Sequence, residues 1–308
     1  MPLNAGREII TGEEINTENT RYDYSPLITR KPFKLPNQAR VAVWVGINIE
    51  HFDIGTADFG ELRPYRAGAP NVMDYSVRDY GNRIGIWRLM ETLDKYNIKA
   101  SVLLNSDVCS HYPIIIEECK KRGWEFLGHG TSNSFPLGGL CETEERQIIA
   151  TTVEVITKAV QQRPVGWLGP ALQETFNTPD ILAENGIRYL CDWCCDDQPF
   201  PMKVKKGSLI SMPYAQDIND RAAFRRQVTA QQFCEMIKDQ FDTLYREGVD
   251  QGRIMCIALH PFLIGQPFRI SWLDKALQYV KGFNDVWFTT SGEIARWYYE
   301  NCLGIKLT

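Results

Sequence analysis

The stretch that decides the fold is Val41-Ala42-Val43-Trp44-Val45-Gly46-Ile47-Asn48-Ile49, closed by Glu50. It is an almost continuous apolar run rich in β-branched residues, which is typical of a strand buried on both faces of a parallel sheet. In repeating β/α proteins, reacting side chains gather at the carboxyl ends of the strands. The run therefore predicts a buried strand that carries Glu50 to a functional site.

Two further strand-like runs end on an imidazole. His129 closes the run that begins at Trp124, and His260 closes Ile254–Leu259, where Pro261 forces a loop to begin. The chain has only 4 histidines, so this placement is informative. Two imidazoles and a carboxylate at three strand ends predict one hydrolytic pocket. The alternative is that each is a hydrogen-bonded residue at a strand boundary.

Short β-rich runs alternate with amphipathic stretches along the rest of the chain, which predicts a single α/β domain built as a distorted (β/α) barrel of about seven parallel strands. The expected strands are residues 40–49, 99–104, 125–128, 165–168, 187–191, 209–212, 254–259 and 286–289. The expected helices are residues 78–96, 112–122, 142–162, 179–185, 230–246, 272–280 and 293–299. Thr290 and Glu293 are spaced as a capping box for the last of these.

A polar, proline-containing arm over residues 1–36 is expected to precede the catalytic barrel of residues 37–308. The Gly- and Pro-containing stretch 55–70 is too short to be a domain linker and is predicted to form a loop over the site.

Composition narrows the function classes. The 308-residue chain has a formal net charge of −4, and its Lys and Arg residues are scattered, so no nucleic-acid partner is expected. No apolar run approaches the ~20 residues that span a bilayer, and the amino terminus does not resemble a signal peptide. A cytoplasmic protein without membrane contact is the expectation, with a small-molecule substrate.

The 9 cysteines are expected to be reduced thiols. The cluster Cys191-Asp192-Trp193-Cys194-Cys195 has no second cysteine pair at zinc-finger spacing, so it is not favoured as a structural zinc site.

Several segments together resemble the polysaccharide deacetylase (NodB-homology) superfamily, and more narrowly its branch of metal-independent allantoinases and cyclic imide hydrolases. These segments are residues 33–43, 48–51, 79–88, 128–130, 164–167, 192–199, 259–261 and 263–269. Each is weak alone, but their order and spacing are specific. The resemblance implies a distorted (β/α) barrel that acts on carbon–nitrogen bonds, and its relatives suggest a homo-oligomer.

The departures from the superfamily pattern concern the metal site. Deacetylases of this superfamily carry an Asp-Asp pair and a His-x-x-x-His motif, where this chain has Glu50-His51 and His129 followed by Asn133. Two imidazoles and an amide make a poor zinc cage. No metal is therefore favoured. If a divalent metal such as zinc binds, its ligands are expected to be His51, His129 and Asn133.

The residues left in place can still hydrolyse an activated amide. Glu50 is expected to deprotonate the attacking water, provided that burial raises its pKa towards neutrality. His260 would protonate the leaving nitrogen or stabilise the oxyanion, with His129 and Asn133 orienting water or the carbonyl. A cyclic imide, ureide or hydantoin-like ring needs least help, because its nitrogen leaves as a stabilised anion.

Five further residues are candidates for binding the substrate: His51, Trp167, Asp197, Phe262 and Arg269. Allantoinase-like relatives tend to carry arginines near the Gly-Trp and His-Pro motifs, and this chain has none there, so allantoin itself is disfavoured. Each of these residues also has a purely structural alternative. Trp167 and Phe262 would pack in the core, Arg269 would form a salt bridge, Asp197 would be solvated or cap a turn, and His51 would belong to a loop.

Three functions follow. The first is a hydrolase of a small cyclic amide that uses Glu50 and His260. The second is a metal-dependent N-deacetylase of an amino sugar or other acyl-amine. The third is a barrel that has lost catalysis and binds a ligand.

Overall fold

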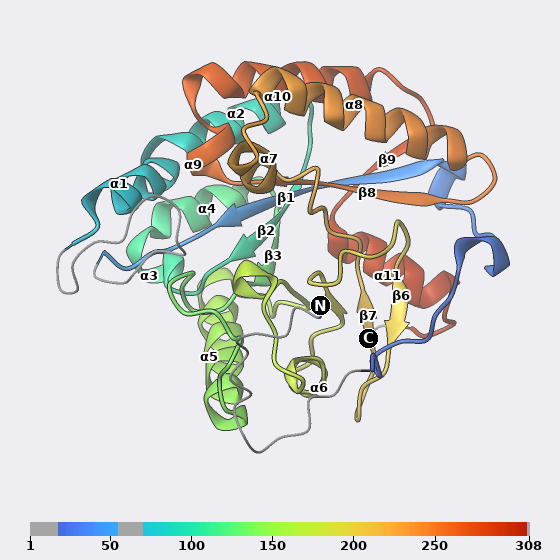
Figure 1. The fold of residues 1–308 in the computed structure, drawn as a ribbon, viewed down its shortest axis with the longest axis horizontal. Coiled ribbons are helices and arrows are strands. Elements are labelled where there is room, and N and C mark those ends of the chain that lie inside the picture. The colour runs from blue at the N-terminus through green and yellow to red at the C-terminus, as the bar shows by residue number, and fades with distance from the viewer. Residues whose placement is uncertain (1–17, 55–69, 307–308) are drawn as a thin grey trace, which may run out of the picture.

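The computed structural model describes residues 18–54 and 70–306. Its centre is a curled, mostly parallel sheet with helices packed around it (Figure 1). The strands are β1 (Val41–Ile49), β2 (Ala100–Leu104), β3 (Glu125–Gly128), β4 (Gly166–Trp167), β5 (Tyr189–Leu190), β6 (Phe200–Met202), β7 (Leu209–Ser211), β8 (Arg253–Leu259) and β9 (Val286–Phe288).

The helices cover the outside of the sheet. They are α1 (Val72–Tyr80), α2 (Ile86–Asp94), α3 (Val108–His111), α4 (Pro113–Lys121), α5 (Glu142–Val160), α6 (Thr178–Glu184), α7 (Asp220–Arg225), α8 (Ala230–Glu247), α9 (Pro261–Ile264), α10 (Pro267–Lys281) and α11 (Ser291–Asn301). A π-helical turn, Gly81–Gly85, joins α1 to α2, and short 3₁₀ turns lie at Leu27–Thr29, Pro36–Gln38 and Pro170–Leu172.

The sheet confirms the predicted distorted barrel. Its strand order is β6-β7-β5-β4-β3-β2-β1-β8, and seven of these strands, all except β6, run parallel. The edge of β1 opposite β8 pairs with β9 in its first half and with β2 in its second half. On its other edge, β8 makes a parallel bridge between Ala258 and Asn219, and its Ile254 N–H donates to the Asp197 carbonyl, but no further strand pairs with it among the described residues. The result is a half-barrel, in which the carboxyl ends of β8, β1, β2 and β3 lie next to one another.

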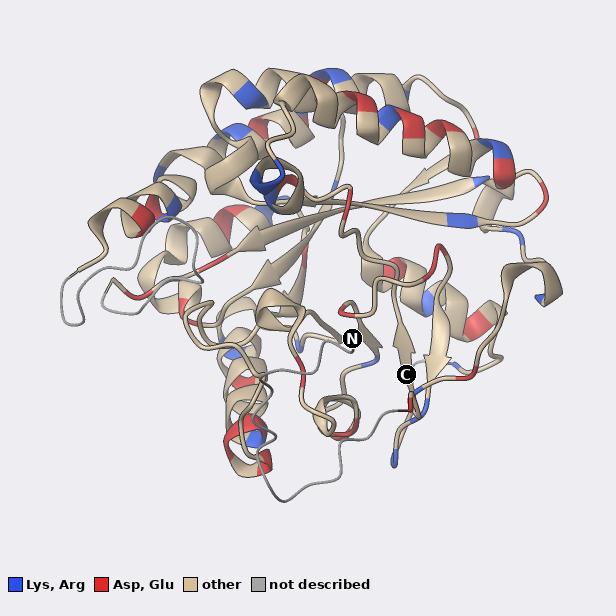
Figure 2. Ribbon diagram, viewed as in Figure 1, with Lys and Arg blue, Asp and Glu red and all other residues tan. Residues whose placement is uncertain are grey.

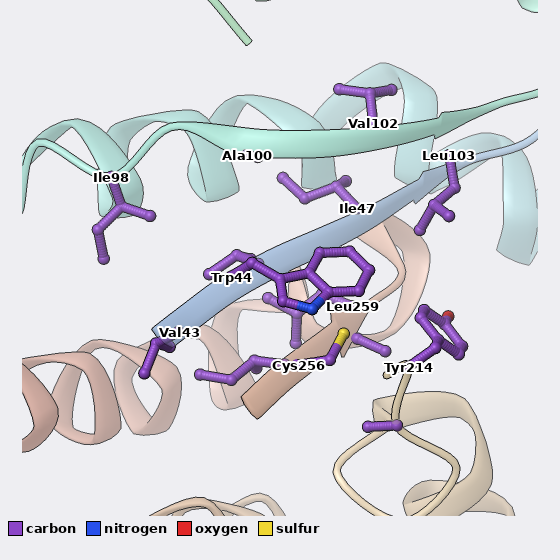
Figure 3. Close-up of a cluster of buried hydrophobic side chains, with 14 of the residues drawn as sticks. Val43, Trp44, Ile47, Ile98, Ala100, Val102, Leu103, Tyr214, Cys256 and Leu259 are labelled. Atoms are coloured by element: carbon purple, nitrogen blue, oxygen red, sulfur yellow. The ribbon is translucent and has the colours of Figure 1, made fainter. Parts of the chain in front are cut away.

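Strand β1 is the centre of the core, as its apolar run predicts. All nine of its residues are buried. Trp44 is fully buried, its ring centroid lies 6.1 Å from that of Tyr214, and its indole N–H donates to the Pro213 carbonyl at 3.1 Å. Figure 3 shows this ring beside Cys256 of β8. The contacts hold the two strands that carry Glu50 and His260 in one packed layer.

The helix expected over residues 78–96 instead begins at Val72 and contains the π-helical turn. Two glycines explain the turn. A Cβ at Gly81 would lie 2.6 Å from the backbone nitrogen of Phe262, and one at Gly85 would lie 2.0 Å from the Pro261 carbonyl oxygen. Only glycine allows α9 to pack this closely on the turn. This contact fixes the chain that directly follows His260.

Most other predicted elements are found within a few residues, and the capping box of Thr290 and Glu293 is present at the start of α11. The helix expected over 272–280 begins earlier, at Pro267. The short elements β6, α3, α7 and α9 were not expected from the sequence.

The division at residue 36 stays a prediction. The described part of the arm lies against the barrel: Arg30 pairs with Asp196 at 2.5 Å, Arg21 pairs with Asp180 at 3.1 Å, and the Phe33 ring packs on Trp297. The predicted loop of residues 55–70 falls almost wholly on 55–69, outside the described residues.

Acidic and basic side chains are interspersed along the helices (Figure 2). Within residues 18–54 and 70–306, no helix combines the length and the apolar character needed to cross a bilayer. All 9 cysteines are free thiols.

Candidate active site

The three strand-end residues singled out by the sequence meet at one carboxylate oxygen. Glu50 follows β1, His129 follows β3 and His260 follows β8. The Nε2 atoms of His129 and His260 lie 3.6 Å and 3.7 Å from Oε1 of Glu50. All three residues are buried. The geometry therefore brings a carboxylate and two imidazoles together at the carboxyl ends of the strands, while their chemical roles stay predictions.

Glu50 is held in place by amide side chains. The Asn133 amide donates to Oε1 of Glu50 at 2.5 Å, and the Asn82 amide donates to the Glu50 backbone carbonyl at 2.9 Å. Asn82 belongs to the π-helical turn, which gives that turn a direct part in positioning Glu50. These bonds fix both the backbone and the carboxylate of the expected base.

The environment of Glu50 corrects one expectation. Burial by itself would raise the pKa of Glu50, but the close polar contact with His129 and the electrostatic interaction with both imidazoles outweigh it, and the pKa lies below its usual value. Glu50 is therefore an anion at neutral pH, and burial does not bring its pKa towards neutrality.

His260 is oriented by Asp220, a residue that the sequence analysis did not identify. Nδ1 of His260 lies 2.7 Å from Oδ1 of Asp220, and Oδ2 of Asp220 accepts hydrogen bonds from the backbone N–H of His260 and of Ile264. Asp220 is the first residue of α7 and is fully buried. It holds a proton on Nδ1 and leaves Nε2 facing Glu50, the arrangement that stabilises an imidazolium.

His129 has the same orientation but a different partner. Its Nδ1 donates to the Leu168 carbonyl at 2.7 Å, so that Nε2 faces Glu50. A backbone carbonyl is neutral, whereas Asp220 is a carboxylate. The two imidazoles beside Glu50 are therefore electrostatically different.

Asn105 was also missed, although it directly follows β2 and so obeys the same strand-end rule. Its amide group donates to the His129 carbonyl and to Oδ1 of Asn133 at 3.2 Å, and its own oxygen accepts from the His51 N–H at 2.9 Å. It ties together the chain segments that follow β1 and β3.

His51 points to a different set of groups. Its Nε2 lies 3.3 Å from Oδ1 of Asp53, and its ring stacks on that of His111 with centroids 4.2 Å apart. Burial and the neighbouring His111 lower the pKa of His51. His51 therefore lies next to the cluster through its backbone, while its ring is engaged by Asp53 and His111.

The residues present do not fit a metal site. Of the three expected ligands, the Asn133 amide donates to Glu50 and the His51 ring is turned to Asp53. Among the residues that the structure describes, no group of three or more His, Cys, Asp and Glu side chains is arranged to hold a metal ion. Zinc sites need three or four such donors on one centre.

Two expected substrate-binding residues lie elsewhere. Trp167 is fully buried, packed with Ile149, Val153 and other apolar side chains under the sheet, with its ring against Gly128. Asp197 is exposed, and its backbone carbonyl accepts from the N–H of Ile254 at the beginning of β8, the end of the strand opposite His260. Neither can line the site.

The two remaining candidates differ. Phe262 is 6 % exposed, and its ring meets that of His260 edge-on at 5.8 Å, so it stays a candidate for the pocket wall. The Arg269 guanidinium is engaged elsewhere: it stacks over the Phe224 ring at 4.0 Å and donates to the Leu263 carbonyl at 3.3 Å. Arg269, in α10, therefore links its helix to α7 and α9.

Comparison with known proteins shows which family this chain resembles. The family model described as polysaccharide deacetylase matches residues 76–190. The crystal structure of PuuE allantoinase superposes with a TM-score of 0.81 and 26% identity, covering 91% of this chain and 99% of that one. The chain thus matches the polysaccharide deacetylase superfamily both in part of its sequence and in its fold.

Two further relatives agree with this assignment. A structure described as a probable polysaccharide deacetylase from Pseudomonas aeruginosa PAO1 has a TM-score of 0.80 and 28% identity, covering 87% of this chain and 93% of that one. The peptidoglycan deacetylase of Helicobacter pylori is 20% identical over 72% of this chain and 86% of its own length. The sequence resemblance is thus confirmed, and the chain is a hydrolase of carbon–nitrogen bonds other than peptide bonds, like the deacetylases and the allantoinase that it resembles.

Proposed function

We propose that this hydrolase opens a small cyclic amide, an imide, ureide or hydantoin-like ring, by activating water with Glu50 and His260. One observation carries the proposal: a single oxygen of an ionised Glu50 lies between two imidazoles, one of which is backed by the buried carboxylate of Asp220. This is a base and an acid side by side at the carboxyl ends of parallel strands.

The reaction begins with Glu50 ionised and His260 protonated on both nitrogens. As the water oxygen bonds to the carbonyl carbon, Glu50 takes one water proton and the carbonyl oxygen becomes an oxyanion, stabilised by the imidazole N–H. The carbon–nitrogen bond then breaks, and Nε2 of His260 gives its proton to the leaving nitrogen. Glu50 returns its proton to His260 across the 3.7 Å separation of Oε1 and Nε2, which restores the starting state.

The substrate class follows from what the site offers. Without a metal to polarise the carbonyl, hydrolysis is easiest for a ring whose nitrogen leaves as a stabilised anion. The similarity to PuuE allantoinase, which extends over 91% of this chain, supports a cyclic substrate. The sequence Trp167-Leu168-Gly169-Pro170 provides no arginine at the place where allantoinase-like relatives tend to have one, which argues against allantoin.

The second candidate is a metal-dependent N-deacetylase, favoured by the similarity to a peptidoglycan deacetylase. It requires ligands that the described residues do not assemble. The two functions separate in one screen of imides, hydantoins, ureides and N-acyl amines, run with and without added zinc. Zinc-dependent release of acetate from an N-acetyl amine, without ring opening, would replace the cyclic-amide proposal.

The catalytic test uses Glu50→Gln, which keeps the size of the side chain and removes its charge, together with His260→Ala. Each is expected to lower kcat by on the order of 10²-fold or more while KM stays within a few-fold, because proton transfer occurs only in the transition state. Asp197→Asn is the matched control, since Asp197 lies at the opposite end of β8. If the two site variants instead weaken ligand binding and no turnover exists, the chain is a binding protein.

A homo-oligomer stays a further proposal. Val72, Met73, Val77 and Ile84 are all at least 42% exposed along α1 and the π-helical turn, and such a surface is suited to a subunit contact. Light scattering at several protein concentrations, with Val77→Glu as a variant, tests it.

A further inference from the structure

One peptide unit joins His129 to a second buried carboxylate. The carbonyl of Leu168 accepts the Nδ1–H of His129 at 2.7 Å. The N–H of Gly169, in the same peptide unit, donates to Oδ1 of Asp192 at 2.7 Å. Because the peptide group is planar and conjugated, a charge on its N–H side polarises its carbonyl. Asp192, the 168–169 peptide, His129 and Glu50 therefore form one continuous chain of contacts.

Asp192 lies two positions after β5, at the same carboxyl end of the sheet as Glu50 after β1 and His129 after β3. Its approach to the peptide depends on glycine: a Cβ at Gly169 would lie 3.0 Å from Oδ2 of Asp192 and 2.7 Å from the Gln173 carbonyl oxygen. A side chain at position 169 would thus push the carboxylate away from the N–H that it accepts.

Glu174 supplies the second half of this arrangement. Oδ2 of Asp192 and Oε1 of Glu174 are both buried, neither has a hydrogen-bond partner among the described residues, and the two side chains interact electrostatically. Two carboxylates cannot share such a contact unless one is protonated. Burial and the charge of Asp192 raise the pKa of Glu174 to about 10, whereas burial raises the pKa of Asp192 only to about 6, so Glu174 is the group that holds the proton and Asp192 is the anion that faces the peptide at neutral pH.

We propose that Asp192 is a positioning residue for the hydrolytic site, acting on His129 through the Leu168–Gly169 peptide unit, with Glu174 as its proton-bearing partner. The proposal rests on the proposed function for its kinetic consequence. Asp192 fixes the proton on Nδ1 of His129 and strengthens the hydrogen bond that turns Nε2 to Glu50. Asp220 orients the His260 ring by direct contact, whereas Asp192 orients the His129 ring through one intervening peptide unit.

Nuclear magnetic resonance of protein labelled with ¹⁵N-histidine provides a test that needs no substrate. With 4 histidines in the chain, the spectrum is simple, and His129→Gln assigns the relevant signal. In the wild type we expect a slowly exchanging, downfield Nδ1 proton on His129. Asp192→Asn keeps an oxygen for the Gly169 N–H but removes the charge, so this proton should move upfield and exchange at least about tenfold faster. Asp192→Ala removes the acceptor and should lose the signal.

Two more variants make the comparison specific. Glu174→Gln still donates to Asp192 and is expected to keep the His129 signal. Asp197→Asn, an exposed carboxylate five positions further along, is the matched control for Asp192→Asn. With the best cyclic amide of the screen, Asp192→Asn should lower kcat about tenfold or more with KM within about threefold.

A His129 signal and a kcat that stay at wild-type values in Asp192→Asn would overturn the proposal, as would an equal change in Asp197→Asn. If no cyclic amide is turned over but the His129 signal responds to Asp192 as described, the proposed substrate fails while the coupling stands.

Discussion

Nδ1 of His260 lies 2.7 Å from Oδ1 of Asp220, a carboxylate with no exposed surface that begins a helix 40 positions earlier in the chain. The same carboxylate accepts two backbone N–H groups, one from the residue before α9 and one from the last residue of α9. Asp220 thus fixes both the ring and the backbone of the expected general acid. The His129 ring, by contrast, rests on a backbone carbonyl. This difference suits His260 to the cationic role in the proposed reaction.

Asp220→Asn tests that assignment. The amide can still fill the space, but it is neutral, so it no longer stabilises the imidazolium of His260. We expect kcat to fall by on the order of 10²-fold with KM little changed. Asp217→Asn, which removes an exposed carboxylate paired with Arg226 in the same segment, is the control and should be neutral. Equal activities of the two variants would contradict the role given to Asp220.

The pH dependence of activity follows from the lowered pKa of Glu50. Burial alone would raise this pKa, and His129 is the first of the groups that lower it. A base must be ionised, so the acidic limb of kcat/KM due to Glu50 should lie below the usual glutamic acid pKa of about 4.3. In His129→Gln, burial is less opposed, and the limb should move to higher pH. Profiles of kcat/KM from pH 3.5 to 8 measure this shift, and a limb that His129→Gln leaves in place would contradict the expectation.

How far the sequence could predict the site depends on the length of each strand and on the side chain that follows it. The long apolar run of β1 gave both a strand and Glu50. Asn105 directly follows β2 and Asp192 lies two positions after β5, so the same rule would have found them had it been extended to amides and to residues just beyond the shorter strands. Asp220 carried no such signal, because α7 is six residues long and has no apolar repeat. Its pairing with His260 is purely tertiary.

In the fold, too, some elements could be predicted from the sequence and others could not. β6 contains Pro201 and pairs antiparallel at the sheet edge, so no apolar alternation marked it. Asp197 was predicted as a site residue from a motif, and a motif gives residue order but not the end of the sheet at which each residue lies. Trp167 was placed in the site for the same reason, since a Gly-Trp motif does not say which face of the sheet the ring occupies.

Removing divalent metals tests whether the activity depends on a metal bound by side chains of the site. The described residues do not assemble three metal-binding side chains, so activity on a cyclic amide should remain largely intact after prolonged dialysis against a chelator. Elemental analysis of the dialysed protein confirms removal. A loss of activity that zinc or manganese restores would show that His51 and His129 act as ligands after rearrangement.

Trp167→Ala distinguishes a core residue from a substrate contact. Because the ring is fully buried against Gly128 and the apolar side chains of α5, we expect the free energy of unfolding to fall by about 3–5 kcal/mol. KM of the fraction that remains folded should be nearly unchanged. Phe176→Ala, at a 70% exposed aromatic residue, is the control for stability. A large rise in KM without loss of stability would restore Trp167 to the site.

The buried carboxyl pair predicts an unusual pH dependence of stability. Burial raises the pKa of Glu174 above its value in the unfolded chain, so the folded state binds the proton more tightly. The stability associated with this proton is fully present below the unfolded pKa of about 4.3 and is lost as pH rises towards the folded value. Glu174→Gln keeps a neutral donor to Asp192 and removes this loss. Compared with the wild type, it should gain on the order of 1–3 kcal/mol in the free energy of unfolding at pH 8 and much less at pH 5, measured by urea unfolding. Glu154→Gln, at an exposed position of α5, should show no such difference between the two pH values. A Glu174→Gln variant whose stability follows that of the wild type at both pH values would show that Glu174 is ionised in the folded protein, and with it the charge pattern around Asp192 would have to be reassigned.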